Sequence, residues 1–143
     1  MNHRIAILSD IHGDTTALEA VIGDARAQGA TEYWLLGDIL LPGPRREDLF
    51  ELLDAIPITA AVRGNWDDCV LEALDGEYGL EDPQEIQLLR LTQYLMEGLD
   101  PKRIDWLRSL PLVEKKEVNG IRFSLTHNLP EKNYGGDLRP ANA

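Results

Sequence analysis

The sequence has little cysteine and no long apolar run. Cys69 is the only cysteine among 143 residues, which excludes an internal disulfide and a cysteine-based zinc site and agrees with a reducing compartment. No stretch approaches the roughly 18 to 20 uninterrupted apolar residues of a membrane span, and the first residues lead into a strand-like segment, not into a signal-peptide core. We therefore expect a cytoplasmic protein with no membrane partner.

Positive charge is also scarce. The chain has 14 Lys and Arg against 25 Asp and Glu, a formal net charge of -11. This balance argues against a long nucleic-acid duplex as partner, because such binding depends on neutralising many backbone phosphates. A small phosphorylated substrate remains compatible, since bound divalent ions can supply the positive charge. Length and a hydrophobic content of 43% favour one globular domain over residues 1–143.

Three short apolar runs are each followed by polar residues. Residues 5–9, 33–36 and 58–62 are predicted to form buried strands. Asp10 and His12 follow the first run, Asp38 follows the second, and Asn65 follows the third. Because open α/β sheets place ligands at the carboxyl ends of their strands, this repeated arrangement predicts an α/β fold with a functional site at one edge of a parallel sheet.

Helical spacing of apolar residues fills the intervals between these runs. A first helix, capped by Thr15 or Thr16, is predicted to run to Gly29, and a second from about 45 to 55. Residues 66–110 are mostly helical in pattern, and we interpret about 67–110 as a helical cap insertion. Residues 113–118 and 121–126 flank Asn119-Gly120, which predicts a hairpin with a type I′ turn. The stretch 133–143 has no hydrophobic period and is predicted to be loop or disordered.

Four short motifs occur in a characteristic order: Asp10-x-His12, Gly37-Asp38, Gly64-Asn65 and Thr126-His127. In this order they resemble the early motifs of the calcineurin-like metallophosphoesterase family, and the opening at residues 9–13 is similar to its small bacterial phosphodiesterase branch. The resemblance covers nearly the whole chain. It implies an α/β/β/α fold, a β-sandwich flanked by helices. It also implies a metal-dependent phosphoesterase that hydrolyses phosphodiesters or nucleotides with a hydroxide activated by two metals.

The resemblance also implies roles for individual residues. Asp10 and His12 would bind one divalent ion, Asp38 would bridge both ions, and Asn65 and His127 would bind the second. Asp38 and Asn65 are thereby candidate catalytic residues. Such oxygen and imidazole ligands suit Mn²⁺, with Fe or Zn²⁺ as alternatives, and a bridging carboxylate can hold two ions about 3.5 to 4 Å apart.

Each of these residues also has an ordinary structural interpretation. The aspartates could cap helices or form turns, the histidines could bond to backbone, and Asn65 could supply an unusual turn conformation. Their joint occurrence at strand ends favours the metal site. Arg63 is a candidate to bind a substrate phosphate, as are Arg45, Arg46 and Lys132, although a solvated basic residue is the more common explanation. His3 has no partner in any motif.

Two departures from the family pattern bear on function. Trp66 stands where many members have a histidine that is thought to protonate the leaving group. No Gly-His-x-His motif follows His127, and the chain has 3 histidines in all. We interpret the chain as a truncated sandwich that lacks its C-terminal part, with weak metal binding, little turnover and a tendency to form homo-oligomers through an uncovered sheet. The alternative function is a non-catalytic metal-binding or interaction module.

Overall fold

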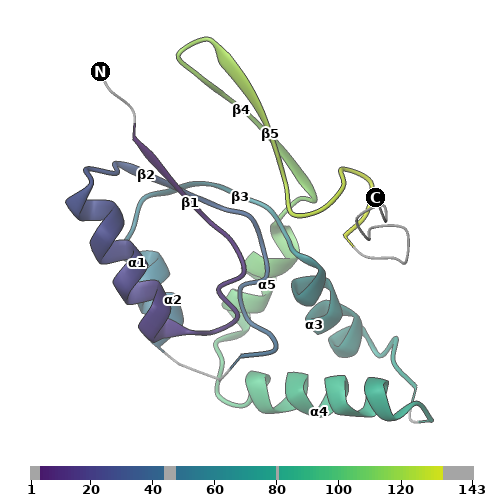
Figure 1. The fold of residues 1–143 in the computed structure, drawn as a ribbon. Coiled ribbons are helices and arrows are strands. Elements are labelled where there is room, and N and C mark those ends of the chain that lie inside the picture. Colours follow the sequence, from purple (N-terminus) through teal and green to yellow (C-terminus); the bar gives the residue numbers. More distant parts are fainter. Residues whose placement is uncertain (1–3, 44–47, 80, 134–143) are drawn as a thin grey trace, which may run out of the picture.

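The computed structural model describes residues 4–43, 48–79 and 81–133. These residues form a parallel sheet with helices on one face and a hairpin on the other (Figure 1). In chain order the elements are β1 (Ile5–Leu8), α1 (Thr15–Ala27), β2 (Glu32–Leu35), α2 (Asp48–Asp54), β3 (Ile58–Ala61), α3 (Asn65–Asp75), α4 (Pro83–Met96), α5 (Pro101–Ser109), β4 (Val113–Val118) and β5 (Ile121–Thr126). The first sheet has the order β1-β2-β3. Both of its strand pairs are parallel, which confirms the predicted parallel sheet.

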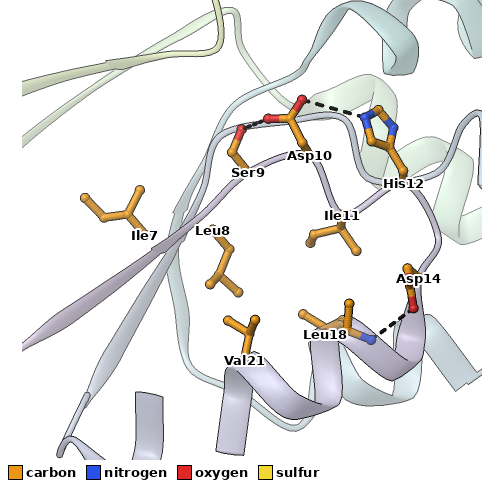
Figure 2. A pocket seen from close by; sticks show the side chains of 10 residues that line it. Ile7, Leu8, Ser9, Asp10, Ile11, His12, Asp14, Leu18 and Val21 are labelled. Atoms are coloured by element: carbon orange, nitrogen blue, oxygen red, sulfur yellow. Dashed lines mark hydrogen bonds and ion pairs between the residues drawn. The ribbon is translucent and has the colours of Figure 1, made fainter. Parts of the chain in front are cut away.

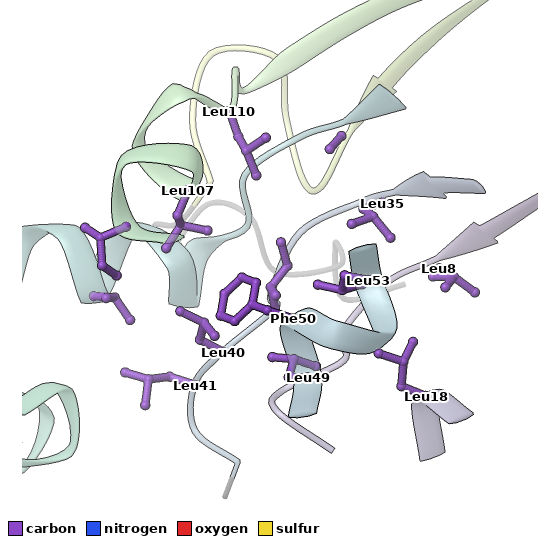
Figure 3. Close-up of a cluster of buried hydrophobic side chains, with 14 of the residues drawn as sticks. Leu8, Leu18, Leu35, Leu40, Leu41, Leu49, Phe50, Leu53, Leu107 and Leu110 are labelled. Atoms are coloured by element: carbon purple, nitrogen blue, oxygen red, sulfur yellow. The ribbon is translucent and has the colours of Figure 1, made fainter. Parts of the chain in front are cut away.

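The middle strand shows how the two faces of the sheet are covered. Tyr33 and Leu35 point into the larger core, where leucines and a phenylalanine from the helices pack against the sheet (Figure 3). Trp34 points the other way and packs against Phe123 and Leu125 of the hairpin, with 5.3 Å between the Trp34 and Phe123 ring centroids. Because side chains alternate along a strand, a strand covered on both faces must be apolar throughout.

The N-cap of the first helix precedes both of the predicted cap residues. Asp14 is the N-cap, and its side chain accepts a hydrogen bond from the Ala17 N–H at 2.9 Å. The predicted cap at Thr15 or Thr16 is therefore wrong, because both threonines already lie inside the first turn. The helix ends at Ala27, shortly before the predicted limit at Gly29. For the second predicted helix, residues 45–47 lie outside the described residues and the remainder is α2.

The predicted helical region contains α3, α4 and α5. The last two begin in the same way, with an aspartate N-cap followed by proline, at Asp82-Pro83 and Asp100-Pro101. All three helices contribute buried residues to the larger core. The interpretation of residues 67–110 as a cap insertion stays a prediction. Among the helices in the described ranges, none combines the length and apolarity needed to cross a membrane.

The hairpin of β4 and β5 has the predicted boundaries and register, with Val118 opposite Ile121. Asn119 and Gly120 have φ angles of 53° and 80°, the left-handed conformations that a type I′ turn requires. The hairpin also covers the outer edge of β3. Glu114 accepts a hydrogen bond from the Ala61 N–H at 2.9 Å, and Lys116 donates to the Thr59 carbonyl at 2.5 Å. Side chains thus occupy edge groups that would otherwise be open to another strand.

The described residues therefore provide a helical layer, a parallel sheet and a second, two-stranded sheet. This agrees with the α/β class. The truncated α/β/β/α sandwich stays a prediction. The stretch expected to be loop or disordered begins at residue 133, and residues 134–143 lie outside the described part of the chain.

Candidate metal centre

The five predicted ligands lie in four segments that meet at one end of the sheet. Asp10 and His12 belong to the loop between β1 and α1, while Asp38 follows β2. Asn65 is the first residue of α3, and His127 directly follows β5. The segments after β1 and β2 stay side by side beyond the strands, because the Asp10 N–H donates to the Gly37 carbonyl and the His12 N–H to the Asp38 carbonyl, at 3.1 and 2.9 Å.

Asp38 is the central residue of this group. Its Oδ2 atom lies 3.8 Å from Nε2 of His12 and 3.4 Å from Nε2 of His127. On one side, potential ligand atoms of Asp10, His12 and Asp38 all lie within 4.8 Å of one another. On the other side, Nε2 of His127 lies 2.9 Å from Oδ1 of Asn65. The structure thus brings all five residues together as two sets that share one buried carboxylate.

Both histidines are oriented by backbone carbonyls of the segment that follows β2. Nδ1 of His127 lies 2.6 Å from the Leu36 carbonyl oxygen, and Nδ1 of His12 contacts the Leu41 carbonyl oxygen. A carbonyl oxygen can only accept, so each Nδ1 carries the proton and each Nε2 faces the carboxylates. This is the usual arrangement of a ligating histidine, in which the second nitrogen is fixed by a hydrogen bond.

Three of the predicted ligands have a left-handed backbone. Asp10, His12 and Asp38 have φ angles of 57°, 50° and 56°. Such a conformation is uncommon outside glycine and costs on the order of 1 to 3 kcal/mol, and it is concentrated at functional sites. This backbone conformation was not predicted from the sequence. The available signal was the residue type, because Asp and His tolerate this region better than most residues.

Glycines allow the loops to approach closely. A Cβ atom on Gly64 would lie 2.1 Å from Oδ1 of Asp38, and one on Gly43 would lie 1.4 Å from the His12 carbonyl oxygen. Real Cβ atoms do not approach other atoms so closely. The backbone itself therefore fills the space around Asp38 and His12, and the ligand positions are set by backbone packing as well as by side chains.

The electrostatics of the group favour a cation. The hydrogen bond with Asp38 raises the pKa of His127 to about 9, and the Leu36 carbonyl and the charges of Asp38 and Asp10 act in the same direction against the effect of burial. The carboxylates attract positive charge, whether a proton or a metal ion. Carboxylate oxygen, amide oxygen and imidazole nitrogen are together a donor set that suits Mn²⁺, Fe or Zn²⁺. The residues present therefore fit a divalent metal.

A hollow of about 470 Å³ adjoins this group. Figure 2 shows Ser9, Asp10 and His12 along one side of it and Asp14 at the start of α1, with apolar side chains of β1, the following loop and α1 along the rest. Asp10 is the accessible member of the group, with 55% of its side chain exposed, whereas Asp38 has only 3%. A ligand in this hollow would contact Asp10 and His12.

The weaker candidates have other contacts. The Arg63 guanidinium donates to Asp68 and, at 2.8 Å, to the Leu110 carbonyl, so its role in binding substrate stays a prediction. The Trp66 ring lies edge-on to His12 with centroids 6.4 Å apart, and the backbone N–H of Trp66 donates to Oδ1 of Asp38 at 2.9 Å. Lys132 lines a separate polar hollow with Arg63. His3, Arg45 and Arg46 lie outside the described residues.

The chain is similar to several proteins of known sequence or structure. The uncharacterized protein MJ0912 of Methanocaldococcus jannaschii is 30% identical over 131 residues, which cover 89% of this chain and 50% of that protein. A metallophosphoesterase from Sphaerobacter thermophilus is 30% identical with a TM-score of 0.58, over 80% of this chain and 44% of its own. The hypothetical protein PH1004 from Pyrococcus horikoshii OT3 is 22% identical with a TM-score of 0.68, over 97% of this chain and 60% of its own.

The chain therefore spans about half the length of these proteins. The similarity to PH1004 is one of fold, whereas the Sphaerobacter protein is similar to this chain in both structure and sequence. A family profile described as calcineurin-like phosphoesterase matches residues 3–140, which include all five predicted ligands. Because this match covers nearly the whole sequence, the chain belongs to the calcineurin-like phosphoesterase family.

Proposed function

We propose that this chain carries the metal centre of a metal-dependent phosphoesterase that hydrolyses phosphodiesters or nucleotides. The observation that carries the proposal is the position of Asp38, whose Oδ2 atom lies within 4 Å of Nε2 in both His12 and His127. A carboxylate in this position suits two ions that share one ligand. Membership of the calcineurin-like phosphoesterase family supports the same reaction class.

The ligands are assigned to two divalent ions, with Mn²⁺ as the first candidate and Fe or Zn²⁺ as alternatives. Asp10 and His12 would hold one ion, Asn65 and His127 the other, and Asp38 both. Two such ions offset the charge of a phosphoryl group and lower the pKa of water, which is the chemistry that phosphoester hydrolysis needs. The net charge of -11 leaves the chain itself poorly suited to attract phosphate without them.

The chain's own residues would fix this centre before a substrate arrives. The carbonyl oxygens of Leu36 and Leu41 hold the two imidazoles with Nε2 toward Asp38. The backbone N–H of Trp66 donates to Oδ1 of Asp38, and Oδ2 faces the histidines. Trp66 has no labile proton for a leaving group, so we expect substrates whose leaving group departs without protonation, such as an aryl phosphodiester.

One observation favours a second function, a non-catalytic metal-binding or interaction module. The chain has 3 histidines, and none lies in a Gly-His-x-His motif of the kind that completes the site in the family. The five assigned ligands would then leave part of each ion's coordination to water, which weakens binding. This version of the site would bind ions without turnover.

Hydrolysis of bis(p-nitrophenyl) phosphate with added Mn²⁺ tests the proposal, with wild type compared to Asp38→Asn. Asparagine tolerates the left-handed backbone at this position, so the substitution changes the ligand with little change of backbone strain. Asp75→Asn is the control, because Asp75 lies outside the site and pairs with Arg108. Mn²⁺-dependent turnover that Asp38→Asn loses and Asp75→Asn keeps is expected of the enzyme.

Calorimetric titration with Mn²⁺ separates the two functions. Binding without turnover supports the module, and turnover excludes it. Equal hydrolysis rates in wild type and Asp38→Asn would show that the proposed centre does not catalyse the reaction.

A further inference from the structure

Asp67 is a fully buried carboxylate beside the metal centre. It lies in the first turn of α3, is 0% exposed, and is not among the predicted site residues. Its side chain accepts three backbone N–H groups: those of Asp38 at 2.8 Å, Ile39 at 2.9 Å and Gly64 at 2.9 Å. A buried carboxylate is costly unless it is hydrogen-bonded, and these three donors offset part of that cost.

The donors belong to two different loops. Asp38 and Ile39 follow β2, whereas Gly64 ends the loop after β3 and directly precedes Asn65. Asp67 therefore joins the segment that carries the shared ligand to the start of α3, which carries a ligand of the second set. A second bond connects the same two segments in the opposite direction, because the backbone N–H of Trp66 in α3 donates to Oδ1 of Asp38 at 2.9 Å.

Capping of α3 does not account for all of this pattern. An acidic residue in the first turn commonly bonds to the N-cap N–H, and here that bond is the one from Gly64. The bonds from Asp38 and Ile39 come from a segment 29 and 28 residues away along the chain. A helix cap needs neither of them. Their common effect is to fix the start of the segment after β2, where Asp38 has its left-handed backbone.

We propose that Asp67 is a positioning residue of the metal centre, which fixes the backbone of Asp38 relative to Asn65. The inference rests on the proposed function only in that the centre binds divalent ions. Replacing Asp67 by asparagine keeps the shape but removes one acceptor, so that an amide N–H₂ meets at least one backbone N–H. Partners that orient metal ligands typically change metal affinity by about 10- to 100-fold when they are mutated.

The test compares Mn²⁺ binding to wild type, Asp67→Asn and Asp75→Asn by calorimetry, at a temperature at which all three are folded by circular dichroism. Asp75 is a matched control, because it lies on the same helix and its exposed side chain pairs with Arg108. We expect Asp67→Asn to lose about 10- to 100-fold in affinity and to show an altered Mn²⁺ electron paramagnetic resonance spectrum at saturation. Asp75→Asn should match wild type in both.

Wild-type affinity together with an unchanged spectrum in Asp67→Asn would overturn the inference while leaving the proposed function intact. Failure of the wild type to bind Mn²⁺ would overturn both. If Asp67→Asn does not fold, amide hydrogen exchange in the wild type decides. Zn²⁺ should slow exchange at Asp38, Ile39 and Gly64 more than at Gly76 at the far end of α3, and equal effects at all four would contradict the positioning role.

Discussion

Nε2 of His127 and Oδ2 of Asp38 lie 3.4 Å apart and join the end of the hairpin to the end of β2. Both side chains are largely buried, with 8% and 3% of their surface exposed. Without a metal, the hydrogen bond with Asp38 raises the pKa of His127 to about 9, which favours the protonated imidazole in this contact. A proton and a metal ion therefore compete for the same position.

The stability of the metal-free chain should depend on pH through this pair. The pKa of His127 is raised from 6.5 to about 9, so its contribution is fully present below the lower value and is lost as the pH rises through the higher one. We expect the thermal midpoints of wild type and His127→Gln, measured with EDTA, to converge between these two values. A difference that stays constant across the window would contradict the assignment.

Loss of Asp38 should weaken metal binding more than loss of Asp10. Asp38→Asn and Asp10→Asn form a matched pair, since both positions have a left-handed backbone that asparagine tolerates. Of these two residues, only Asp38 contacts the histidines of both sets, so its substitution would affect both proposed ions instead of one. Mn²⁺ titration of both variants measures the order, and a milder effect at Asp38 would argue against a bridging role.

Two glycine-to-alanine substitutions should change stability in opposite directions, because Gly64 packs closely against Asp38 and Gly23 has free space around it. In Gly64→Ala the new Cβ would lie 2.1 Å from Oδ1 of Asp38, and we expect a loss of about 1 to 3 kcal/mol, as for other overpacked sites. In Gly23→Ala the new Cβ would meet nothing within 4 Å, inside α1. Alanine is the better helix former there by about 0.5 to 1 kcal/mol. Denaturant unfolding of both variants checks the two signs.

The thiol of Cys69 should react slowly. Burial raises its pKa, so little thiolate is present at pH 8. We expect Ellman's reagent to modify native Cys69 more slowly than free cysteine, and the two rates to become equal in guanidinium chloride. A native rate equal to that of free cysteine would show that the site is open to solvent.

Glu114 should protect the outer edge of β3. Glu114→Ala leaves the Ala61 N–H without its acceptor, a change that typically costs about 1 to 3 kcal/mol when the donor stays buried. Glu117→Ala is the control, because Glu117 lies on the same strand and is exposed. Unfolding and light scattering should show lower stability and more association for Glu114→Ala only.

Local patterns in the sequence were enough to predict the strands and the hairpin. Residues 33–36 form a short apolar run, which is typical of a strand covered on both faces. Asn119-Gly120 is the residue pair that favours a type I′ turn. The helix cap was less determined, because residues 14, 15 and 16 are all capping types. The two long-range bonds of Asp67 could not be predicted, since an acidic residue in a first helical turn is already explained by the helix dipole.

The left-handed backbone at Asp10, His12 and Asp38 restricts which sequences this site can sample. Apart from glycine, the residues that enter this conformation most readily are asparagine, aspartate and histidine, and each has an oxygen or nitrogen that can bind a metal. Most other substitutions at these positions would therefore destabilise the fold before they could affect metal binding. The substitutions that folding tolerates, glycine aside, largely exchange one potential ligand for another, so such a centre would change its choice of metal more readily than it would disappear.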